Sequence, residues 1–130
     1  ITRLLRRWRL LTVTGAGGSG KTRRALHLSV KLKSRFPGGI WPAGLASVTD
    51  PARVPQAILS ALHLREAVGC ELTDILVQSL AGRRTMLLLD NCEHLLDACA
   101  ELVEGMLRRC PELHILATSR ERLGVAGEQV

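Results

Sequence analysis

The chain has 130 residues, of which 46% are hydrophobic and 2% aromatic, and its formal net charge is +6 at pH 7. This length and apolar content suit one domain with a proper core and exclude a disordered tail. The apolar runs are far shorter than the ~20 residues of a membrane-spanning helix, and the basic residues 1–9 lack the apolar centre of a signal peptide. We therefore expect a cytoplasmic protein without a membrane partner.

The first predicted element is an apolar strand over residues 10–14, which leads into a glycine-rich loop. Residues 15–22 read GAGGSGKT and match the phosphate-loop pattern G-x-x-x-x-G-K-[ST]. Glycines let backbone N–H groups point at a phosphate chain, and a helix over residues 21–34 would add the positive end of its dipole. The alternative is a plain glycine turn between a strand and a helix.

The residues assigned to the nucleotide come from this loop and from the first turn of the helix. They are Gly15, Gly17, Gly18, Ser19, Gly20, Lys21 and Thr22. The Lys21 ammonium is expected to reach the β- and γ-phosphates, and the Thr22 hydroxyl is expected to ligate Mg²⁺.

The next elements lead away from the loop. A second strand is predicted over residues 40–48, and Pro42 places it at an edge of the sheet, because proline is tolerated on edge strands. Asp50-Pro51 is typical of a helix entry, with the aspartate as cap. A further helix is predicted over residues 72–80.

The third strand is predicted over residues 86–90, an apolar run that ends in an acid and suits a parallel strand buried on both faces. Ligands bind at the carboxyl ends of such strands, so Asp90 is expected to hold Mg²⁺ directly or through water. The alternative is that Asp90 caps a helix, with Glu93 completing a pair that resembles a capping box.

Hydrolysis needs a group that orients or deprotonates the attacking water. The residue after Asp90 is Asn91, which can orient a water but cannot take its proton. Glu93 is a candidate for this task, or else it only stabilises a helix N-terminus. We therefore expect slow or partner-dependent hydrolysis.

An amphipathic helix is predicted over residues 95–107, with Cys99 on its apolar face, and a fourth strand over residues 113–118. In the common strand order the fourth strand lies between the first and the third, and its end then faces the γ-phosphate. Arg120 would there detect that phosphate through charge-assisted hydrogen bonds. The alternative is a solvated loop arginine. Lys21, Asp90, Glu93 and Arg120 form the candidate catalytic set.

These elements predict an α/β fold: a P-loop NTPase three-layer sandwich with a mainly parallel sheet. Residues 1–9 are interpreted as a basic lead-in and residues 10–130 as a partial domain. The chain stops after the fourth strand without another obvious strand, so we expect a sheet truncated there, with an exposed edge, in a piece of a longer protein.

Five segments add a more specific resemblance; in order they span residues 15–22, 36–41, 49–55, 87–95 and 116–124. Together they resemble the ATP-binding domain of large bacterial transcriptional regulators of the LuxR and SARP (AfsR-like) type, which is similar to NB-ARC modules of the STAND class. The resemblance implies ATP or ADP as the ligand, Asp90 as the Mg²⁺-associated acid and Arg120 as the γ-phosphate sensor.

The same resemblance implies a regulatory switch. ADP would hold a closed monomer, and ATP with an inducer would open it for self-association. Winged-helix and sensor domains would belong to the parent protein, and DNA would be bound only through a domain outside this chain.

Three functions are therefore weighed. The first is a nucleotide-dependent switch module with slow Mg²⁺-dependent ATP hydrolysis at most. The second is a small-molecule kinase or another P-loop phosphotransferase, because a phosphate loop suits both. The third is a non-enzymatic nucleic-acid-binding module, which the net charge invites but the scarcity of aromatic residues disfavours.

Overall fold

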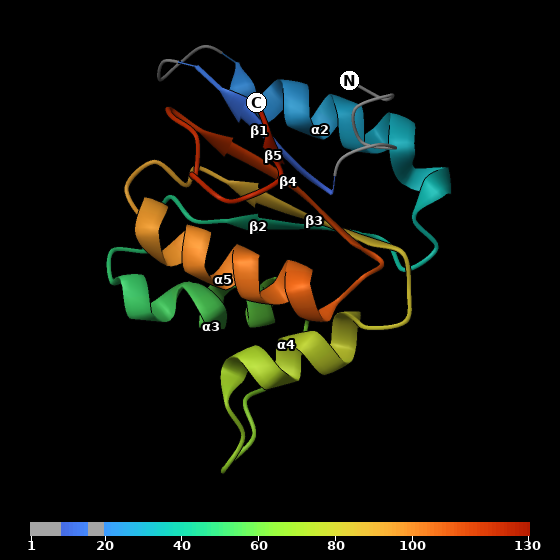
Figure 1. Ribbon diagram of the computed structural model, residues 1–130, viewed down its shortest axis with the longest axis vertical. Helices are drawn as coiled ribbons and strands as arrows, with labels where there is room; N and C mark the ends of the chain where they lie inside the picture. The colour runs from blue at the N-terminus through green and yellow to red at the C-terminus, as the bar shows by residue number, and fades with distance from the viewer. Residues whose placement is uncertain (1–8, 16–19) are drawn as a thin grey trace.

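The computed structural model describes residues 9–15 and 20–130, and within these residues it contains one five-stranded sheet in the order β2-β3-β4-β1-β5. The strands are β1 (Leu10–Thr14), β2 (Ile40–Gly44), β3 (Thr85–Asp90), β4 (Leu113–Ser119) and β5 (Glu128–Gln129). Every neighbouring pair is parallel, as the predicted fold requires (Figure 1).

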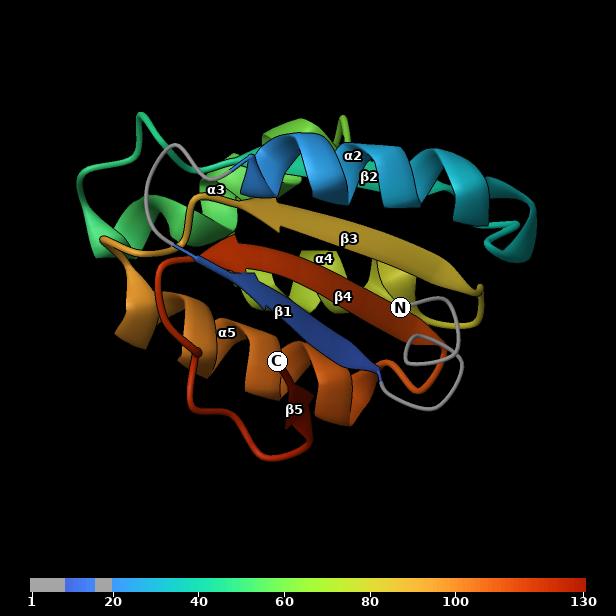
Figure 2. The same ribbon diagram turned by 90° about the horizontal axis from the view of Figure 1, so that it is seen from above.

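The helices lie on both faces of this sheet. They are α2 (Lys21–Leu32), α3 (Val54–Ala61), α4 (Leu72–Leu80) and α5 (Leu96–Arg109), with short 3₁₀ turns at Lys33–Arg35 and Pro51–Arg53. Of these four helices, α2 covers one face, and α3, α4 and α5 cover the other (Figures 1 and 2). The predicted three-layer α/β sandwich is confirmed. None of the helices in residues 9–15 and 20–130 has the length and apolar character needed to cross a lipid bilayer.

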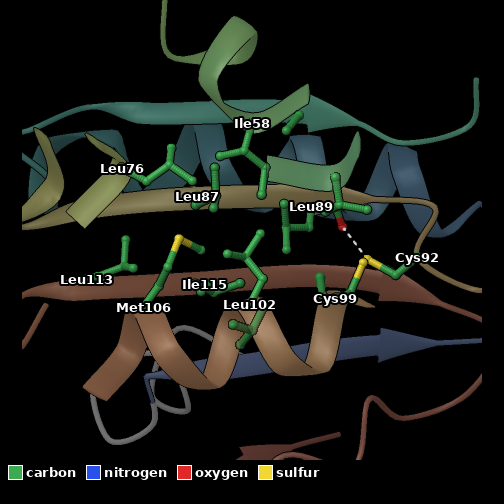
Figure 3. Close-up of a cluster of buried hydrophobic side chains, with 14 of the residues drawn as sticks. Ile58, Leu76, Leu87, Leu89, Cys92, Cys99, Leu102, Met106, Leu113 and Ile115 are labelled. Atoms are coloured by element: carbon green, nitrogen blue, oxygen red, sulfur yellow. Dashed lines mark hydrogen bonds between the residues drawn. The ribbon is translucent and has the colours of Figure 1, made fainter. Parts of the chain in front are cut away.

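Strand β3, predicted from the apolar run of residues 86–90, is buried on both faces of the sheet. Side chains alternate between the two faces of a strand. Leu87 and Leu89 accordingly join the core beneath α3, α4 and α5, whereas Met86 and Leu88 join the core beneath α2. Both faces are covered, which is the setting in which a parallel strand needs no polar residues. Cys99, predicted on the apolar face of its helix, is buried in the larger core (Figure 3).

The edge position predicted for β2 is confirmed, since among the described strands β2 is the end strand of the sheet and pairs only with β3. Pro42 stands opposite Leu88 in this pairing. The strand ends at Gly44 rather than at residue 48, because Leu45 turns into the core and a turn closes from the Val48 N–H to the Leu45 carbonyl at 3.1 Å.

The entry to α3 also agrees with the sequence. The Asp50 carboxylate accepts a hydrogen bond of 3.0 Å from the Ala52 N–H, and Pro51 begins the 3₁₀ turn that leads into the helix.

The expectation that the sheet stops after the fourth strand is wrong. Strand β5 pairs with the outer edge of β1, so that Leu10 stands opposite Glu128 and Leu11 opposite Gln129. A strand of two polar residues has no apolar alternation that a sequence pattern could reveal. The edge of β1 is therefore partly covered.

His114 on β4 is half-buried and packs edge-on against the Phe36 ring, with the ring centroids 5.3 Å apart. Within the part of the chain that the structure describes, its Nδ1 atom has no hydrogen-bond partner. Burial lowers the pKa of His114 below its ordinary value, and the charges of Arg84 and Arg9 act in the same direction. The folded chain therefore binds this proton less readily than the unfolded chain.

We expect this difference to make the free energy of unfolding decrease as the pH falls below about 6.5, the ordinary histidine pKa. Chemical denaturation at pH values on either side of that point measures the effect. His114→Gln should reduce the pH dependence, and His27→Gln, at an exposed position on α2, should leave it unchanged. An identical pH dependence in the chain and in His114→Gln would contradict the assignment.

Candidate functional site

The candidate site lies where the carboxyl ends of β1, β3 and β4 meet below the start of α2 (Figure 2). In the register of the sheet, Thr14 stands opposite Ser119 and Leu89 opposite Ala117. The carboxyl ends of β1, β3 and β4 therefore lie at the same edge of the sheet. The predicted ligands Gly17, Gly18 and Ser19 lie outside the described residues, but both ends of the loop are described.

Gly20 ends the loop in the left-handed region, with φ 81° and ψ 19°, immediately before α2. A side chain here would meet no atom within 4 Å, so the backbone conformation is what calls for glycine. The Gly20 carbonyl accepts the first helical hydrogen bond from Arg24 N–H at 3.0 Å. The sharp reversal allows the helix to begin directly at Lys21.

Lys21 is a buried cation, with 7% of its surface exposed. Its ammonium donates a hydrogen bond of 2.8 Å to the Gly15 carbonyl and lies 3.8 Å from Glu93 Oε1. A buried charge needs such partners to offset its desolvation. The ammonium thus reaches back from the start of α2 to the residue that follows β1.

One carboxylate oxygen of Asp90 accepts hydrogen bonds from two hydroxyl groups. Thr22 Oγ1 donates to Asp90 Oδ1 at 2.8 Å and Thr118 Oγ1 donates to the same atom at 2.5 Å. The two residues predicted to serve Mg²⁺, Thr22 and Asp90, are therefore in contact although 68 positions separate them. A hydroxyl and a carboxylate side by side are hard oxygen donors of the kind Mg²⁺ takes, so these residues fit the ion.

Thr118 was not among the predicted site residues. Its hydroxyl accepts a hydrogen bond of 2.8 Å from the Asn91 N–H, and its carbonyl accepts one of 2.9 Å from the Cys92 N–H. It thus fixes the turn that follows Asp90. The sequence signal for it was its place at the end of an apolar strand, two residues before the predicted sensor.

The capping interpretation of Asp90 and Glu93 is wrong. Helix α5 begins at Leu96, the residue before it is Leu95, and no side chain caps its N-terminus. Asp90 is instead the last residue of β3.

Glu93 lies in the turn between β3 and α5, between two polar partners. One is the Lys21 ammonium. The other is the Asn91 side chain, whose amide, with its nitrogen turned toward the carboxylate, lies 2.5 and 2.8 Å from the two Glu93 oxygens. Asn91 itself has φ 71°, which an asparagine tolerates better than most residues. This carboxylate is engaged with its neighbours.

Arg120 follows β4 directly, and β4 lies between β1 and β3, which confirms the predicted strand order. The residue is exposed. Among the described residues its guanidinium makes no ion pair or hydrogen bond, so the structure does not bring it into contact with Lys21 or Asp90.

Several bacterial proteins have sequences similar to this chain. An uncharacterized protein of Mycobacterium tuberculosis, Rv0894, is 45% identical over 98% of the chain, which spans 33% of that protein. A protein of the same organism named as an HTH-type transcriptional regulator, Rv0890c, is 45% identical over 96% of the chain and 14% of its own length. The regulatory protein AfsR of Streptomyces griseus is 30% identical over 85% of the chain and 12% of its own length.

The chain therefore spans a third or less of these relatives. No family model matches it. Among solved structures, that of the ORC2 protein of Aeropyrum pernix in ADPNP-ADP complexes is similar to this chain. The two superpose with a TM-score of 0.62 over 86% of this chain and 34% of that one. The sequence identity is 15%, so this likeness concerns the fold alone.

Proposed function

We propose that the chain is the nucleotide-binding module of a regulatory switch and binds ATP or ADP with Mg²⁺ at the carboxyl ends of β1, β3 and β4. The observation that carries the proposal is the contact of 2.8 Å between the Thr22 hydroxyl and Asp90, where Thr22 directly follows the buried Lys21 in the chain. Lys21 would supply a cation for the phosphates, and the oxygen atoms of Thr22 and Asp90 would bind Mg²⁺. Lys21 and Thr22 directly follow the glycine-rich loop.

Four site residues would have distinct tasks: Lys21, Thr22, Asp90 and Arg120. Lys21 would bind the β- and γ-phosphates, since an ammonium forms strong charge-assisted hydrogen bonds with phosphate oxygens. Thr22 and Asp90 would hold Mg²⁺, which neutralises charge on the phosphates when bound. Arg120 would detect the γ-phosphate from the end of β4.

Glu93 would compete with a bound phosphate for the Lys21 ammonium. In the structure it lies beside the ammonium that a phosphate would need. A bound phosphate would replace Glu93 as the partner of Lys21 and leave the carboxylate held by Asn91. Since Asn91 occupies the position after Asp90 and cannot take a proton, we expect hydrolysis to be slow at most.

The relatives support the regulatory part of the proposal. Two of them are named as regulators, and ORC2 is described with ADPNP and ADP. We extend this to a switch of the STAND or NB-ARC type within a LuxR or SARP regulator, in which ATP and ADP favour different states. Such a switch requires differential affinity of the two states for the two nucleotides. Self-association would follow ATP binding, and DNA would be bound by another part of the parent protein.

The sensor role of Arg120 provides the test of the switch. Arg120→Ala should weaken binding of Mg-AMPPNP about 10- to 100-fold and leave Mg-ADP unchanged, because a hydrogen bond between charged groups contributes about 1.5–3 kcal/mol. Titration calorimetry with both nucleotides measures the ratio. Arg122→Ala, at an exposed position two residues away, is the matched control and should change neither affinity. Equal losses for both nucleotides in Arg120→Ala would contradict the sensor role.

A further inference from the structure

The segment after β4 returns along the outside of β1. It leaves the carboxyl end of the sheet at Ser119 and comes back to β5 beside Leu10 and Leu11 (Figure 2). Leu123 and Val125 anchor it, since both side chains are buried in the larger core. Arg120 lies at the start of this segment.

The Glu128 carboxylate gathers three donors from this region. Its Oε2 atom accepts hydrogen bonds from Thr12 Oγ1 at 2.5 Å and from the Leu123 N–H at 2.8 Å. Its Oε1 atom accepts one from the Gly124 N–H at 3.0 Å. In the described part of the chain, no lysine, arginine or histidine forms an ion pair with it. A carboxylate with this donor set ties the Thr12 side chain to the backbone of residues 123 and 124 rather than balancing a charge.

Thr12 makes this contact a link to the phosphate loop. It lies in the middle of β1, with 1% of its surface exposed, and three residues later the chain reaches Gly15. One carboxylate therefore joins the strand that leads into the loop to the segment that follows Arg120.

Arg120 is consequently held between two fixed points. On one side, Ser119 pairs with Thr14 in the sheet. On the other side, Leu123 is fixed by Glu128 and by its own burial. Only residues 120–122 lie between them. A short span with both ends fixed has few conformations to lose when its side chain engages a ligand.

We propose that Glu128, through Thr12 and the Leu123 and Gly124 amides, is a positioning residue that holds Arg120 toward the γ-phosphate side of the site. This role rests on the proposed nucleotide function. Glu128 touches no reacting group and acts through the conformation of residues 120–122.

The tether itself is tested by trypsin, which cleaves after Arg120 and Arg122, both exposed. Glu128→Gln is nearly isosteric, but its amide nitrogen must face at least one of the donors that the carboxylate accepts. We expect cleavage at these two sites to be several-fold faster in Glu128→Gln than in the unmodified chain. Glu101→Gln makes the same charge change at an exposed position on α5, away from both cleavage sites, and should not alter the rate. Equal rates in all three chains would overturn the tether.

The positioning role is tested by the preference between Mg-AMPPNP and Mg-ADP. Glu128→Gln should lower the affinity for Mg-AMPPNP several-fold and leave that for Mg-ADP unchanged, and it should add nothing further to Arg120→Ala, because both act through one group. Thr12→Val should reproduce this loss and Thr12→Ser, which keeps the hydroxyl, should restore the preference. A loss shared equally by both nucleotides, or no loss, overturns the positioning role alone. If the unmodified chain binds neither nucleotide, the proposed function falls and the positioning role with it.

Discussion

Replacing Lys21 by alanine is expected to weaken Mg-ATP binding about 10- to 100-fold, because a hydrogen bond to a charged group contributes about 1.5–3 kcal/mol. The loss has a second source in this structure. Glu93 lies 3.8 Å from the ammonium, and without Lys21 its negative charge would face the phosphates unpaired. Thermal unfolding with and without nucleotide measures the effect. Stabilisation of about 2.7 kcal/mol at a ligand concentration of 100 times Kd should fall to about 1.4 kcal/mol or less at that concentration.

A matched control is available on the same helix. Lys31→Ala removes an exposed lysine ten residues further along α2 and should leave nucleotide-induced stabilisation unchanged. Combining Lys21→Ala with Glu93→Gln should recover the part of the loss that comes from repulsion. Full stabilisation of Lys21→Ala by Mg-ATP would show that the nucleotide binds elsewhere or without this ammonium.

Asp90→Asn is expected to remove the dependence of ATP binding on Mg²⁺. Asparagine keeps an oxygen that can accept the hydrogen bonds from Thr22 and Thr118, so the fold should survive. The variant loses the negative charge that favours the cation. In excess Mg²⁺ we expect about tenfold weaker ATP binding, equivalent to about 1.4 kcal/mol. In EDTA the affinity should be equal to that of the unmodified chain or higher, since a carboxylate no longer repels the phosphates.

Titrations of ATP in Mg²⁺ and in EDTA separate these two effects. Asp97→Asn makes the same chemical change at an exposed position in the first turn of α5 and serves as the control. An unaltered Mg²⁺ dependence in Asp90→Asn would remove Asp90 from the metal site. Equal weakening in both media would indicate a structural loss instead.

The parts of the site that the sequence predicted depend on the sheet. The apolar run of β3 indicated a central strand, and an acid at its carboxyl end had to approach the start of α2 once the strands were parallel. The contact between Thr22 and Asp90 is the consequence. Local patterning was sufficient here because the sheet has the common strand order that was expected, in which β4 separates β3 from β1.

The parts that were missed depend on side-chain contacts between distant residues. Nothing in the pattern around Glu93 showed that it would face Lys21, because the start of α5 at Leu96 lengthens the preceding turn. Glu128 likewise became informative only when three donors, one of them 116 positions away, converged on its carboxylate. Propensity and periodicity describe neighbours along the chain and cannot report such convergence.

Titration calorimetry of the unmodified chain with ATP, ADP and GTP in the presence of Mg²⁺ tests directly whether the chain binds adenine nucleotides. We expect saturable binding of both adenine nucleotides at one site per chain, with GTP weaker and with binding reduced in Lys21→Ala. Absence of heat from adenine nucleotides at millimolar concentration, in a sample that unfolds cooperatively, would contradict a nucleotide site at the carboxyl ends of β1, β3 and β4.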